Sequence, residues 1–185
     1  MRKHAARIVL LFLAAGAAAA ADRDRVLVAA GVSYLLPADP GFKEIYGARA
    51  FYPEAWAGVR VIHGVHVMGG FGWLRKNGTT PELELPARST QTLLWAGLGY
   101  IGEVHRSILF KVEAGPARIG YKEEALDLSV SGSGIGFHGG FGLIFLGQTV
   151  FTALDLGYVG ASDTYEDVRL KLGGFKATLS VGARF

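Results

Sequence analysis

Cysteine is absent from the 185-residue sequence, which excludes a disulfide framework and a metal site built from thiolates. Beyond residues 1–21, the chain also lacks any apolar run of the ~20 residues that a transmembrane helix needs. Half of the residues are nevertheless hydrophobic, and 27 are glycine. A chain that enters a membrane without such helices must satisfy its backbone hydrogen bonds in a closed β-barrel.

Residues 1–21 have the three parts of a cleaved secretory signal peptide. Arg2, Lys3 and Arg7 form a basic start, residues 8–15 form an apolar core, and residues 17–21 are all alanine. The apolar run is too short for a transmembrane helix. We therefore predict a signal peptide over residues 1–21, cleaved after Ala21, and one mature domain over residues 22–185.

The mature chain lacks an excess of charge of either sign. Residues 1–21 hold three of the 19 basic residues and none of the 16 acidic ones, so residues 22–185 carry 16 of each. A neutral chain has no positive field to attract the phosphates of nucleic acids. No nucleic-acid partner is therefore expected.

The last eleven residues alternate strictly between apolar positions and positions that are small or polar. This period of two fits a strand with hydrocarbon on one face and a polar interior on the other. The ending resembles the C-terminal signal of bacterial outer-membrane barrels, which implies the barrel-assembly machinery as a partner during biogenesis. The residues assigned to this assembly signal are Phe175, Leu179, Val181 and Phe185.

The same alternation predicts eight strands, each near the roughly 9–11 residues that a tilted membrane-spanning strand needs. A soluble lipocalin-like barrel is the alternative, but it would place the apolar residues inside. Here the charged residues lie opposite the aromatic ones, which favours a membrane barrel. The predicted strands are Arg25–Leu35, Ala55–Ile62 (with Phe51 as an alternative start), Val65–Arg75, Ser89–Ile101, Ser107–Tyr121, Gly134–Phe145, Val150–Ala161 and Leu170–Phe185.

The connections between these strands alternate between short and long. Short links are predicted near residues 63–64, 102–106 and 146–148, and longer polar loops at residues 36–50, 76–88, 122–132 and 162–169. Short periplasmic turns and longer outer loops are typical of bacterial outer-membrane barrels. This pattern predicts an all-β, eight-stranded antiparallel up-and-down barrel with both termini in the periplasm.

The chain resembles the small eight-stranded outer-membrane proteins of the OmpA membrane domain, OmpX and opacity-protein type. The resemblance covers residues 22–185 and rests on the architecture, the signal peptide and the ending Leu-Ser-Val-Gly-Ala-Arg-Phe. It implies a Gram-negative cell envelope, with outer-membrane lipid and lipopolysaccharide as partners. It says little about activity, because the same barrel carries several unrelated functions.

Charged residues on the inward faces are expected to form a buried network in the lumen, because an unpaired charge there would be costly. Assuming a hairpin centred between Gly147 and Gln148, His138 would pair with Gly157, diagonal to Asp155. Glu113, His138, Asp155 and Ser180 would then lie at similar heights, which raises the alternative of a Ser-His-Asp catalytic set. The residues assigned to the network are Arg60, Lys111, Glu113, His138, Asp155, Lys176 and Arg184.

Nucleophilic catalysis also needs substrate access and an oxyanion site, and a lumen filled by large side chains offers neither. We therefore expect no enzyme activity, no cofactor and no metal site. The predicted role is envelope structure or surface interaction through four outer loops, whose extracellular ligand the sequence does not identify. An OmpW-like narrow channel for small hydrophobic or ionic solutes is the first alternative, and a lipid-modifying barrel enzyme the second.

Overall fold

The computed structural model describes residues 25–81, 83–126, 128–165 and 168–185. The predicted signal peptide, residues 1–21, lies outside these described residues. No helix in the described part of the chain is long and apolar enough to cross a membrane.

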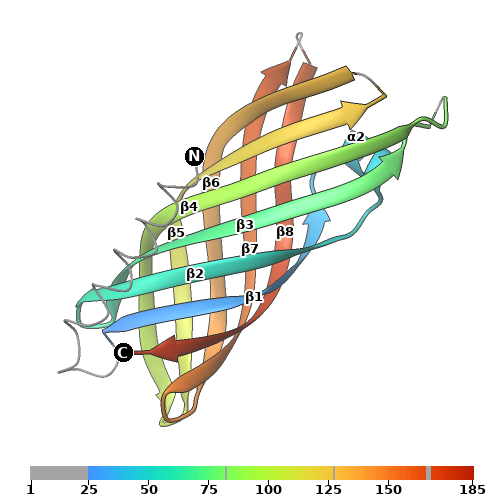
Figure 1. Ribbon diagram of the computed structural model, residues 1–185. Helices are drawn as coiled ribbons and strands as arrows, with labels where there is room; N and C mark the ends of the chain where they lie inside the picture. Colours follow the sequence, from blue (N-terminus) through green and yellow to red (C-terminus); the bar gives the residue numbers. More distant parts are fainter. Residues whose placement is uncertain (1–24, 82, 127, 166–167) are drawn as a thin grey trace, which may run out of the picture.

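The described residues form a closed antiparallel barrel in which each strand pairs with its sequence neighbours and β1 pairs with β8 (Figure 1). One short helix, α2, covers Pro40–Tyr46 between the first two strands. The predicted all-β barrel is confirmed. Its strands are β1 (Val26–Pro37), β2 (Ala50–Ile62), β3 (Val65–Thr79), β4 (Pro86–His105), β5 (Ile108–Ala125), β6 (Leu128–Leu146), β7 (Val150–Tyr165) and β8 (Val168–Arg184).

The outer face of the barrel is apolar, as the alternation predicted. Leu143, Leu154, Leu179 and Val32 are cross-strand neighbours in one row over four strands, and their side chains are 40%, 47%, 58% and 54% exposed. The four residues assigned to the assembly signal also point outward. Because a lipocalin-like barrel would bury these side chains inside, the soluble alternative is wrong.

The inward face is filled by side chains. Trp56, Met68, Trp95, Ile144 and Phe151 belong to one buried cluster that draws on many strands. Inward glycines make room for the larger rings: a Cβ at Gly70 would collide with the indole of Trp95 on the neighbouring strand. An eight-stranded barrel is narrow enough for such side chains to fill it.

The two ends of the barrel differ. We call one the turn end: it carries three tight turns, at residues 63–64, 106–107 and 147–149, and the described chain ends, where Arg25 N donates to Phe185 O over 2.8 Å. We call the other the loop end: it carries α2, at the upper right in Figure 1, and the connections β3–β4, β5–β6 and β7–β8.

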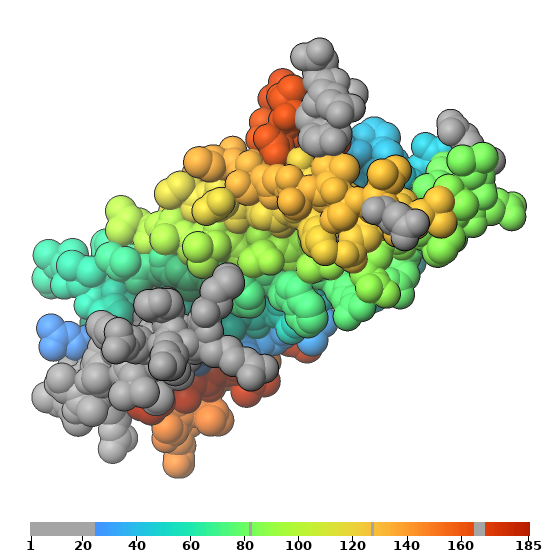
Figure 2. Space-filling model, turned by 45° about the horizontal axis from the view of Figure 1, so that its top comes forward, coloured from blue at the N-terminus to red at the C-terminus, as the bar shows by residue number. Residues whose placement is uncertain are grey.

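The predicted long loops are the main error of the sequence analysis. The pairing of β3 with β4 continues to Thr79 and Pro86, that of β5 with β6 to Ala125 and Leu128, and that of β7 with β8 to Tyr165 and Val168. In Figure 2 the β7–β8 extension (orange-red) and the β3–β4 extension (green) project from the body of the barrel. Polar side chains outside the membrane do not prevent strand pairing. The change from apolar to polar residues therefore indicates where a strand leaves the membrane, not where the strand ends.

The first long connection contains a helix that was not predicted. Asp39 caps it by accepting a hydrogen bond from Phe42 N at 2.9 Å, and Pro40 occupies the first helical turn. Both residues are favoured at these positions. Gly47 ends the helix with φ of +89°, a backbone conformation that favours glycine.

The register between β6 and β7 also differs from the prediction. The turn runs from Gly147 to Val150, closed by a Gly147 N to Val150 O hydrogen bond of 2.8 Å. Its centre lies one residue further along the chain than assumed, which shifts the pairing by two. His138 therefore pairs with Val159, not with Gly157.

The outward row that contains Leu179 allows a test of which surface faces lipid. Leu179→Arg places a cation on the apolar band and should lower the free energy of unfolding in lipid vesicles by roughly 2–4 kcal/mol, the cost near the membrane centre. The matched control is Ile135→Arg, because Ile135, 77% exposed, is the cross-strand neighbour of an outward arginine, Arg118. The Ile135→Arg variant should lower the free energy of unfolding by at most about 1 kcal/mol. Equal costs for both variants in urea titrations would contradict this assignment of the band.

Candidate functional site

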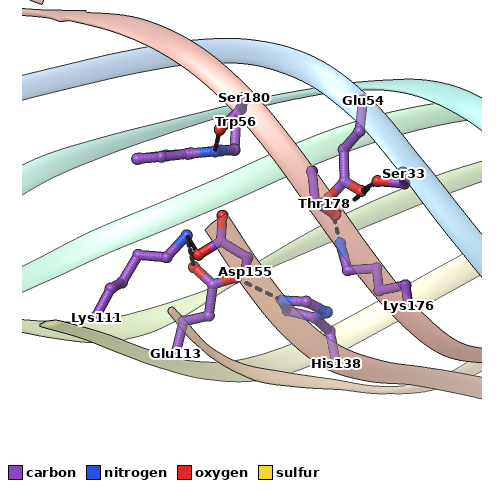
Figure 3. A network of polar contacts seen from close by, with 10 residues as sticks. All are labelled: Ser33, Glu54, Trp56, Lys111, Glu113, His138, Asp155, Lys176, Thr178 and Ser180. Atoms are coloured by element: carbon purple, nitrogen blue, oxygen red, sulfur yellow. Dashed lines mark hydrogen bonds and ion pairs between the residues drawn. The ribbon is translucent and has the colours of Figure 1, made fainter. Parts of the chain in front are cut away.

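Four of the predicted network residues meet in the lumen. Lys111 Nζ lies 3.1 Å from Glu113 Oε2 and 3.0 Å from Asp155 Oδ1, and its side chain is 1% exposed. His138 Nε2 lies 3.0 Å from Glu113 Oε1 on the other side. We call these four residues the central cluster (Figure 3).

The strand register explains why Lys111 can bridge two acids. Lys111 on β5 is the cross-strand neighbour of Gly142 on β6, and Gly142 is the neighbour of Asp155 on β7. A Cβ at Gly142 would collide with the Asp155 carboxylate and the Leu154 carbonyl. The glycine therefore leaves the space through which the two side chains reach each other.

Two tryptophans enclose the central cluster. The ammonium of Lys111 lies 4.1 Å from the centre of the Trp56 ring, within the range of a cation–π interaction. Trp95 stacks on the imidazole of His138 with the ring centres 4.2 Å apart. These rings cover the buried charges, and a buried charge without a partner is costly.

A second group of polar residues lies across the lumen. Lys176 forms an ion pair with Glu54, and Ser33 donates to the other carboxylate oxygen of Glu54. Thr178 shares a 2.7 Å hydrogen bond with Ser33. We call Ser33, Glu54, Lys176 and Thr178 the second cluster; Figure 3 shows it facing the central cluster across the barrel.

The remaining predicted network residues lie elsewhere. Arg184 is at the turn end, where its guanidinium donates to the carbonyl oxygens of Gly147 and Gln148. Arg60 is half-buried near the start of the turn between β2 and β3, opposite His66. Glu54, the partner of Lys176, was missed because the inward residues of the second strand were assigned only from Trp56 onward. The alternation of Tyr52, Glu54 and Trp56 could have revealed it.

The alternative of a catalytic Ser-His-Asp set requires a hydrogen bond between nucleophile and base. Ser180 instead accepts from Trp56 Nε1 at 3.4 Å, and His138 pairs with Glu113. Among the described residues, no group of three or more His, Asp or Glu side chains is arranged to hold a metal ion. The charged side chains of the two clusters are thus paired within the lumen rather than presented to a substrate.

A cavity of about 430 Å³ lies at the loop end of the lumen. One wall is α2, which packs against β3 and β1, and the other walls come from β1, β4, β5, β6 and β8. The lining is mostly apolar, and its volume is in the range of small-molecule sites. Its apolar residues include Leu35, Phe42, Ile45, Ala87, Ala125, Leu128, Val130, Leu170 and Leu172.

Two contacts fasten α2 over this cavity. The hydroxyl of Tyr46 donates to the carboxylate of Glu123, which also accepts from Ser89 Oγ at 2.6 Å. Asp39 accepts from Lys171 N at 3.2 Å. Burial and the neighbouring carboxylate raise the pKa of Tyr46 well above its usual value, so the phenol stays a donor.

No protein-family model and no curated protein matches the sequence. Solved structures do resemble it. Neisserial surface protein A aligns with a TM-score of 0.65 and 12% identity over 89% of this chain and 99% of that one. Ail of Yersinia pestis, solved in complex with the heparin analogue sucrose octasulfate, aligns with a TM-score of 0.60 and 14% identity over 89% of this chain and all of that one.

The outer membrane protein AlkL, solved in lipid bilayers, aligns with a TM-score of 0.51 and 13% identity over 89% of this chain and 91% of that one. These identities are low, so the likeness concerns the fold. This chain has the fold of the small eight-stranded outer-membrane β-barrels, consistent with the resemblance to the OmpA and OmpX type.

Proposed function

We propose that this chain is a non-catalytic bacterial outer-membrane barrel whose lumen is closed to solutes. The observation that carries the proposal is the pair of buried clusters between the loop-end cavity and the turn end. Its role is then envelope structure and contact with external molecules through the loop end. Both chain ends would lie on the periplasmic side, with lipid and lipopolysaccharide around the barrel.

Charge pairing supports a closed lumen. The two clusters hold three carboxylates, Glu54, Glu113 and Asp155, against two lysines, Lys111 and Lys176. Glu113 has a further partner in the fully buried His138, whose Nε2 lies 3.0 Å from its Oε1. Ions crossing this region would have to displace partners that already satisfy one another, and the barrier would be high because these charged groups are buried.

A narrow channel, the alternative function, would require a different lumen in this region. A conduit would need small side chains or a continuous polar path along the lumen. Trp56, Trp95 and Met68 instead fill it from three strands, each with less than 5% of its surface exposed. The cavity at the loop end is therefore better explained as a recess that ends inside the barrel than as the entrance of a channel.

The central cluster predicts a large cost for losing its only lysine. Lys111→Met keeps much of the side-chain volume but leaves Glu113 and Asp155 without their ammonium partner. We expect a loss of about 3–5 kcal/mol, typical of removing one partner from a buried ion pair. Urea unfolding of the refolded barrel, followed by tryptophan fluorescence, measures this.

The matched control is Lys122→Met on the same strand. Lys122 pairs with Glu124, but its side chain is 52% exposed, and an exposed pair contributes about 1 kcal/mol or less. If both variants lost the same small amount, the central cluster would not be the buried support described above.

Conductance tests the closed lumen itself. The refolded protein in planar bilayers should show no steady ion conductance in KCl at either polarity, because the two clusters and tryptophans fill the lumen. A water-filled porin inserted under the same conditions is the positive control. Regular open steps that scale with KCl concentration would favour the channel. A lipid A modification assay run on the same preparation should show no product; activity there would favour the enzyme alternative.

A further inference from the structure

The loop-end cavity has a polar group at its inner end. Gln91 on β4 lines the cavity and is 8% exposed. It also lines the narrow space below, with Tyr52, Leu74 and Ile119, and so marks the floor. Its carboxamide forms no hydrogen bond with another described residue, and its atoms are not among the fully buried ones that lack a partner. The carboxamide is therefore accessible from the cavity, where a ligand can hydrogen-bond to it.

The other polar groups of the cavity are already engaged or lie at its rim. Glu123 accepts from Tyr46 and Ser89, and Asp39 accepts from the backbone of α2 and β8. Asp39, Glu123 and Glu124 outnumber the one lining lysine, Lys171. Anions are thus disfavoured, and a bare cation would lose its hydration in an apolar recess.

We propose that the cavity binds a neutral amphiphile: an alkyl chain with one uncharged hydroxyl or carbonyl group, which hydrogen-bonds to Gln91. The alkyl chain packs against the apolar walls and α2. The cavity is lined by inward side chains and separated from lipid by the barrel wall, so the ligand enters as a solute from the loop end. This site goes beyond the proposed function and does not depend on whether the lumen conducts.

The size of the ligand follows from the cavity. At about 30 Å³ for each water-sized group, the volume of about 430 Å³ holds roughly 14 non-hydrogen atoms. Each methylene buried contributes about 0.8 kcal/mol, which is close to a fourfold gain in affinity. A series of primary alcohols should therefore bind about fourfold more tightly with each added carbon, and the gain should stop once the cavity is full.

The test measures binding of the alcohols hexanol to hexadecanol to the barrel in lipid nanodiscs by titration calorimetry, with empty nanodiscs subtracted. Ala87→Phe, which fills part of the cavity, should weaken octanol binding at least tenfold. Leu98→Phe is the matched control on the outer face of the same strand, where the side chain is 61% exposed, and it should change nothing. Heat-modified gel migration verifies that each variant is folded.

Gln91→Leu tests the polar anchor. The variant should weaken octanol binding by about threefold to tenfold, the range of one hydrogen bond, and leave octane binding unchanged or tighter. Gln91→Asn keeps the amide and should lose less. No saturable binding above empty nanodiscs, or equal binding by Ala87→Phe, would overturn the site. An unchanged octanol-to-octane ratio in Gln91→Leu would overturn the role of Gln91.

Discussion

The pairing of β1 with β8 is the constraint on which the other features of the structure depend. It runs from Leu27 opposite Arg184 to Pro37 opposite Gly174 and converts an open sheet into a ring. A closed ring leaves no edge strand, and so no unpaired backbone groups in hydrocarbon. It also forces every second residue inward. Once the apolar positions face outward, the polar and charged side chains at the inward positions must share one narrow interior.

That shared interior explains the division of the lumen. Toward the turn end, Lys111, Glu113 and Asp155 come within ion-pair distance, and the tryptophans fill the remaining space. Toward the loop end, the inward positions are mostly apolar, and α2 covers them from one side without filling the space. The barrel thus combines a packed, charge-paired region with a recess that faces the loop end.

The sequence predicted what depends on a period of two: the number of strands, the inward and outward faces, and four members of the central cluster. It did not predict the strand extensions, since polar residues beyond the membrane pair as well as apolar ones. The Gly147–Val150 turn shifted one register by two residues, which no alternation pattern encodes. Asp39 and Pro40 form a helix-start signal, which a search for a period of two does not detect. The cavity could not be predicted, because α2 and several strands each contribute a part of its wall.

The absence of cysteine allows a direct test of the central claim that no aqueous path crosses the lumen. Single cysteines would replace Ala87 at the cavity, Ser180 beside Trp56, and exposed Ser107 at the turn end. A membrane-impermeant thiol reagent would then be applied separately to each side of oriented vesicles. We expect Ala87→Cys to react from the loop side, Ser107→Cys from the turn side, and Ser180→Cys from neither. Reaction of Ser180→Cys at a rate close to that of Ser107→Cys would contradict a closed lumen.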